Sequence, residues 1–149
     1  MVVELRTILF AEDNPRDVEL TLEALRDHNL ANNVIVVRDG VETMEYLRRE
    51  GKYKQRKTGN PAVLLLDIKM PRMDGIEVLR AIRSDNLLKM LPVVMLTSSR
   101  EEQDLIRSYE LGVNAYVVKP VDFKEFIEAV KQVGVFWAVI NEVPPLGNI

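Results

Sequence analysis

Five short, unbroken apolar runs constrain the fold of this chain more than any other feature. They cover residues 7–11, 34–37, 62–66, 93–96 and 115–118. Each run is too short for a buried helix, and continuous apolarity predicts a strand covered on both faces, as in a parallel sheet. Segments with helical periodicity separate the runs. We therefore predict a doubly wound α/β domain with right-handed crossovers.

The expected helix starts carry short polar side chains, which can accept hydrogen bonds from a first helical turn. Asn14 precedes Pro15 and is expected to cap the first helix, and Asp122 is expected to cap the fifth. The second, third and fourth helices are expected to follow the pairs Asp39-Gly40, Asp74-Gly75 and Ser98-Ser99. Gly112 is expected to end the fourth.

Composition excludes several classes of function. The chain has 149 residues, which suits one domain, and it has no cysteine and one histidine, His28. Zinc sites built from His and Cys are therefore excluded, and His28 is interpreted as a solvated surface residue. The net charge is −3, and no apolar run approaches the roughly 20 residues of a membrane span. We expect a cytoplasmic protein that binds neither nucleic acid nor membrane, with the basic stretch 48–57 as a solvated loop.

Polar and charged residues follow four of the five runs. Glu12 and Asp13 follow the first, Asp67 the third, Thr97 the fourth and Lys119 the fifth. Parallel strands bring these residues to one edge of the sheet, where ligands of open α/β domains bind. Three carboxylates repel one another unless a cation is present, and oxygen ligands in an open site favour Mg²⁺. The pattern predicts a Mg²⁺-dependent carboxylate that can accept a phosphoryl group.

The motifs together resemble the receiver domain of two-component response regulators over residues 8–133. Those motifs are Glu12-Asp13, the stretch DIKMPRMDG at residues 67–75, Thr97-Ser98 and Lys119-Pro120. The resemblance implies a flavodoxin-like fold, with a five-stranded parallel sheet in the order 2-1-3-4-5 flanked by five helices. It also implies a phosphoprotein rather than an enzyme, with self-phosphotransfer and slow self-dephosphorylation only.

The resemblance assigns a role to each matching residue of the site. Asp67 is the phosphoacceptor. Mg²⁺ is bound by Asp13, by Glu12 directly or through water, by Asp67 and by the backbone carbonyl of Lys69. Lys119 pairs with the phosphoryl group, and its bond to Pro120 is expected to be cis.

A switch pair and a partner are also implied. Thr97 and Tyr116 match the residues that move when the family is phosphorylated, although an aromatic residue in a strand is also typical of simple packing. The partner is a histidine kinase. The loop before the third strand, the stretch 108–111 and Phe136-Trp137 resemble single-domain regulators paired with bacterial phytochromes.

The C-terminal part predicts an interaction surface. Residues 138–149 are expected to be a tail, so residues 1–149 form a single receiver domain without an output domain. Apolar residues recur at helical spacing from Phe123 to Ile140, which is a wider stripe than one sheet face requires. We expect a homodimer through the fourth and fifth helices and the fifth strand, with Val133, Phe136, Trp137 and Ile140 at the interface.

Three alternatives stay open. A receiver-like scaffold that is never phosphorylated shares the same residues. An aspartate-nucleophile phosphatase is disfavoured because Lys69 stands where that class has a second aspartate as general acid. A flavin or nucleotide site is disfavoured because Glu12-Asp13-Asn14-Pro15 follows the first strand in place of a Gly-rich or Ser/Thr-rich phosphate loop.

Overall fold

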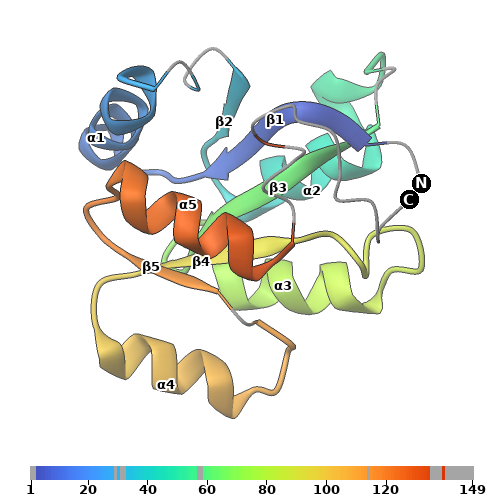
Figure 1. The fold of residues 1–149 in the computed structure, drawn as a ribbon. Helices are drawn as coiled ribbons and strands as arrows, with labels where there is room; N and C mark the ends of the chain where they lie inside the picture. The colour runs from blue at the N-terminus through green and yellow to red at the C-terminus, as the bar shows by residue number, and fades with distance from the viewer. Residues whose placement is uncertain are drawn as a thin grey trace, which may run out of the picture.

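The computed structural model describes residues 3–28, 30, 33–56, 59–113, 115–134 and 139. Within them, strands and helices alternate along the chain as the sequence predicts (Figure 1). The elements are β1 (Val3–Ala11), α1 (Pro15–Arg26), β2 (Val34–Val37), α2 (Gly40–Arg48), the 3₁₀ helix η2 (Gly51–Tyr53), β3 (Asn60–Asp67), α3 (Gly75–Ser84), β4 (Val93–Thr97), α4 (Arg100–Ser108), β5 (Tyr116–Val118) and α5 (Phe123–Gln132).

All strand pairs are parallel, and the sheet order is β2-β1-β3-β4-β5. This confirms the predicted fold class and strand order. The register pairs Asp67 with Leu96, and Thr97 with Val118. The carboxyl ends of the central strands therefore lie at one edge of the sheet.

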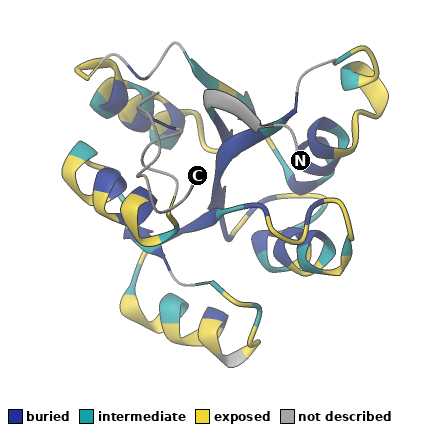
Figure 2. Ribbon diagram, turned by 45° about the vertical axis from the view of Figure 1, so that its right-hand side comes forward, coloured by how far each residue is buried: buried dark blue, intermediate teal, exposed yellow. Residues whose placement is uncertain are grey.

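Helices cover both faces of the sheet, which explains why the strands read as unbroken apolar runs. Helices α1 and α5 pack on one face, where Phe10, Leu65 and Phe126 belong to the same hydrophobic core cluster. Helices α2 and α3 pack on the other face, where Leu9 and Leu64 belong to the core. The central strands β3 and β4 are buried almost throughout, whereas the edge strands β2 and β5 and the outer sides of the helices are partly exposed to solvent (Figure 2).

The predicted helix starts are confirmed by side-chain caps. The side chains of Asn14, Asp39, Asp74, Ser99 and Asp122 each accept a hydrogen bond from a backbone N–H of the first turn. The predicted end of the fourth helix is wrong. Helix α4 ends at Ser108, because the chain already leaves the helix where Glu110 adopts a φ of 53°.

The described part of the basic stretch, residues 48–56, is largely exposed, as the sequence predicts, but it also makes contacts with α2. Glu42 on α2 accepts a hydrogen bond from the Tyr53 hydroxyl at 2.7 Å and pairs with Lys52 Nζ at 2.7 Å. The guanidinium of Arg56 lies 4.2 Å from the centre of the Tyr46 ring. Among the described residues of this stretch, Lys52 and Arg56 therefore attach the loop to α2.

Helix α5 accounts for part of the C-terminal apolar stripe. Phe126 and Val130 are fully buried, and Val133 is half-buried against the same core cluster. Three of the four predicted interface residues, Phe136, Trp137 and Ile140, lie outside the described residues. The predicted dimer interface therefore stays a prediction. Within the described part of the chain, every helix is too short or too polar to cross a bilayer.

Candidate functional site

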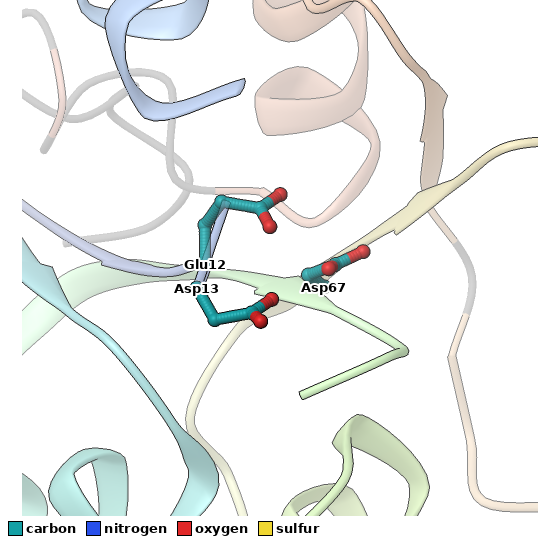
Figure 3. A group of neighbouring side chains, drawn as sticks. All are labelled: Glu12, Asp13 and Asp67. Carbon is teal, nitrogen blue, oxygen red and sulfur yellow. The ribbon is translucent and has the colours of Figure 1, made fainter. Parts of the chain in front are cut away.

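Three carboxylates meet at the carboxyl ends of β1 and β3. Glu12 and Asp13 directly follow β1, and Asp67 is the last residue of β3. One carboxylate oxygen from each lies within 4.8 Å of the other two. Figure 3 shows the three side chains beside one another, with Glu12 and Asp13 on one segment and Asp67 on the other. Adjacent parallel strands thus assemble the cluster that the sequence predicts.

Glu12 is the most deeply buried of the three. Its residue is fully buried, its backbone N–H donates to the Val37 carbonyl at 3.0 Å, and its Oε2 accepts from the Asn14 N–H at 3.2 Å. Burial and the charge of Asp67 together raise the pKa of Glu12 to about 7, against the opposing effect of Lys119. When Glu12 is ionised, the negative charge of the site therefore exceeds its positive charge.

Lys119 supplies the ammonium group of the site. Its Nζ lies 2.9 Å from Oδ1 of Asp67 and 3.0 Å from Oε1 of Glu12. Burial by itself lowers the pKa of Lys119, but its contacts with Asp67 and Glu12 outweigh burial and hold that pKa above its ordinary value. The peptide bond to Pro120 is cis, as expected. The ammonium is therefore charged and lies between two of the carboxylates.

The same ammonium also contacts Asp17, which the sequence analysis missed. Oδ2 of Asp17 accepts a hydrogen bond from Lys119 Nζ at 3.3 Å. Asp17 lies in the first turn of α1, which begins at the edge of the sheet. A signal was present in the sequence, because a helix that starts two residues after a strand-end carboxylate points its first turn at the same edge.

Asp13 makes the cluster suitable for a divalent cation. It is exposed, and within the described residues its carboxylate has no hydrogen-bond or ion-pair partner. Asp13 and Asp67 line one open pocket with Glu12, Lys69 and Lys119. The side chain of Asp67 is only 6% exposed, but this pocket connects it with solvent. Oxygen donors in an open site are the ligands that Mg²⁺ and Mn²⁺ prefer.

Close backbone packing fixes the loop after β3. The Gly75 N–H donates to the Ile68 carbonyl at 2.7 Å. A Cβ atom at Gly75 would lie 2.2 Å from the Asp67 carbonyl oxygen, so only glycine fits there. Further along the loop, the Arg72 guanidinium makes two hydrogen bonds to the Asp39 carboxylate, at 2.9 and 3.0 Å. The segment that carries Lys69 is therefore held at both sides.

Thr97 and Tyr116 lie on neighbouring strands. Thr97 is fully buried at the end of β4, and its Oγ1 accepts a hydrogen bond from Gln103 Nε2 at 3.4 Å. Tyr116 begins β5 and is half-buried, with its hydroxyl donating to the Val113 carbonyl at 3.3 Å. The Arg107 guanidinium lies 5.0 Å from its ring centre. Both side chains thus contact α4 in this conformation.

Glu102 makes a second set of contacts that the sequence analysis missed, and these contacts join α4 to the site. Glu102 accepts hydrogen bonds from the backbone N–H and the hydroxyl of Ser98, at 2.6 and 3.0 Å. Its other oxygen lies 3.7 Å from Lys69 Nζ. Burial by itself raises the pKa of Glu102, but the hydrogen bonds from Ser98 and the charge of Lys69 leave it lowered. The position of Glu102 four residues after Ser98 was the signal in the sequence that could have predicted this contact.

Comparison with known proteins decides the family. The family model for the response regulator receiver domain matches residues 8–131. The chain belongs to the response regulator receiver family. Response regulator Rcp1 of Synechocystis sp. is 38% identical over 139 residues, which span 93% of each protein.

Solved structures agree with this membership. The structure of the bacteriophytochrome response regulator AtBRR is 60% identical, with a TM-score of 0.86, and the match covers 93% of this chain and 99% of that one. The phosphorylated cyanobacterial phytochrome response regulator RcpA is 38% identical, with a TM-score of 0.71, over 95% and 99% of the two chains. An Mn²⁺-bound structure of Rcp1 is 36% identical, with a TM-score of 0.68, over 97% and 99%. This receiver therefore has relatives among phytochrome-associated regulators.

Proposed function

We propose that this receiver is a phosphoacceptor regulator that takes a phosphoryl group from a histidine kinase onto Asp67. One observation carries the proposal. The Asp67 carboxylate lies in an open pocket between an ammonium group, at 2.9 Å, and the carboxylates of Glu12 and Asp13. A nucleophilic oxygen with a cation on one side and cation ligands on the other is suited to attack on phosphorus.

Phosphoryl transfer to Asp67 needs no general base, because the ionised carboxylate has no proton to lose. One oxygen of the ionised Asp67 attacks the phosphorus of a phosphohistidine, so that an O–P bond forms while the P–N bond breaks. The electron pair of the P–N bond stays on the imidazole, which takes a proton from water. Lys119 donates to a phosphoryl oxygen and stabilises its negative charge, which the neighbouring carboxylates would otherwise repel.

The residues present fit a bound Mg²⁺ ion. Glu12, Asp13 and Asp67 would hold it with carboxylate oxygens, and Lys69 would add its backbone carbonyl. When bound, the ion neutralises carboxylate charge and polarises the phosphoryl group. The Mn²⁺-bound structure of the relative Rcp1 supports a divalent ion in this family.

The output would be a change of protein–protein contact. Thr97 and Tyr116 are the proposed switch pair, since both contact α4 and would rearrange once Thr97 turns toward the phosphoryl group. The similarity to a bacteriophytochrome response regulator and to a cyanobacterial phytochrome response regulator supports a bacterial phytochrome as the partner kinase. We also propose a cytoplasmic location, because a chain without cysteine suits a reducing compartment.

The proposed homodimer involves α4, β5, α5 and the segment from Val133. Leu105, Tyr109 and Val118 on this face are 51%, 45% and 41% exposed, which supports a surface available for association. Sedimentation at high micromolar concentration, with and without phosphorylation, tests it. Detection of monomer alone in both conditions would exclude the dimer.

Incubation with acetyl phosphate and Mg²⁺, followed by intact mass measurement, tests the phosphoacceptor role. We expect one added phosphoryl group on the wild type and none on Asp67→Asn. Asp27→Asn, at the exposed end of α1, is the control and should gain the group normally. An unmodified wild type would favour the scaffold alternative, and steady release of phosphate over many turnovers would favour a phosphatase.

A further inference from the structure

We propose that Asp17 is a positioning residue that competes with the phosphoryl group for Lys119 and so restrains phosphorylation of Asp67. This inference rests on the proposed function and adds a carboxylate that belongs neither to the acceptor nor to the expected metal ligands. Asp17 would hold one donor of the ammonium in the unphosphorylated protein. A phosphoryl oxygen would then have to displace it.

Three carboxylates contact the ammonium group of Lys119, and the contact with Asp17 has the geometry of a hydrogen bond. An ammonium group has three N–H donors, and three carboxylates surround this one. Asp67 and Glu12 lie at 2.9 and 3.0 Å, and Asp17 at 3.3 Å. A phosphoryl oxygen that approaches Lys119 therefore meets an ammonium group that already donates a hydrogen bond to Asp17.

Asp17 is the partner that can be displaced most easily. Its side chain is 29% exposed, compared with 1% for Glu12 and 6% for Asp67, so water can solvate it once the contact breaks. It also makes the longest of the three contacts. Lys119 stays fixed by the two shorter contacts, so loss of Asp17 frees a donor without moving the ammonium.

Capping of α1 does not explain the Asp17 carboxylate. The side chain of Asn14 caps this helix by accepting from the backbone N–H groups of Arg16 and Asp17, at 2.9 and 3.3 Å. The Asp17 carboxylate points instead to Lys119, which is 102 residues away in the sequence. Its charge adds to the negative charge that a phosphodonor meets at the pocket.

Asp17→Asn is the informative substitution because it removes the charge and keeps the shape. At saturating Mg²⁺, we expect acetyl phosphate to modify the variant about three to ten times faster than the wild type. This factor corresponds to the free energy of one hydrogen bond or of one partly exposed ion pair. We also expect slower loss of the phosphoryl group after the donor is removed. Glu19→Gln is the matched control, since it removes the same charge from an exposed site on α1.

Metal binding separates a positioning role from structural damage. Asp17→Asn should weaken Mn²⁺ binding, measured by electron paramagnetic resonance, by about threefold at most, because one negative charge near the site is lost. Faster phosphorylation with such modest weakening supports the proposal. A phosphorylation rate equal to or below that of the wild type overturns it. A wild type that is never phosphorylated overturns the proposed function as well, so the two failures are distinguishable.

Discussion

Replacement of Glu12 by glutamine should change how the stability of this receiver depends on pH. Burial and the Asp67 charge raise the pKa of Glu12 from its ordinary value of 4.5 to about 7. Between these two pH values, the carboxyl group of Glu12 therefore keeps its proton in the folded protein but loses it in the unfolded chain. This stabilises the folded state fully below pH 4.5, and the stabilisation is lost as the pH rises to about 7. The rise in pKa corresponds to about 3 kcal/mol of unfolding free energy.

Urea unfolding in the presence of EDTA measures this effect. Between about pH 4 and about pH 8, the free energy of unfolding of the wild type should fall by about 3 kcal/mol relative to Glu12→Gln. The amide keeps an oxygen that can accept from the Asn14 N–H, so the comparison isolates the proton. Glu19→Gln, on the exposed side of α1, should follow the wild type. A stability difference between wild type and Glu12→Gln that stays constant across this pH range would refute the reasoning.

Three further predictions concern the loop after β3 and the metal. Gly75→Ala should cost about 1–3 kcal/mol of stability in urea unfolding, because the added Cβ meets the Asp67 carbonyl oxygen. Arg72→Ala should cost only about 0.2–1 kcal/mol in thermal unfolding, because the Arg72 side chain that pairs with Asp39 is 57% exposed. Addition of Mg²⁺ after EDTA should raise Tm more at about pH 8 than at about pH 6, since Glu12 must ionise to bind the ion. An equal rise at both pH values would contradict the assignment of Glu12 as a ligand.

Local sequence signals predicted most of the fold. The apolar runs gave the strands to within a few residues, and Asn14, Asp74 and Asp122 cap the helices that they precede. These features depend on neighbouring residues alone, because a cap or a buried strand is recognised from its own side chains. The end of α4 was mispredicted because the turn there uses a left-handed Glu110 rather than the nearby Gly112.

Contacts between distant residues were not accessible in the same way. The contact of Asp17 with Lys119 and that of Glu102 with Lys69 join segments far apart in the sequence. The attachment of the basic loop to α2 through Glu42 and Tyr53 was also missed. Each of these contacts depends on where a whole helix or loop packs, and a local sequence pattern does not predict that position.

The amino-acid order alone determined which segments form the strands and α-helices of the sheet domain, and the edge of the sheet at which Glu12, Asp13 and Asp67 meet. Parallel strands have a fixed direction, so a residue that ends a strand can be assigned to an edge before any coordinates are known. Only the tertiary structure decided the electrostatics of that edge. The pKa of Glu12 depends on how much water packing excludes, and the donors of Lys119 depend on distances of a few ångströms between separate elements.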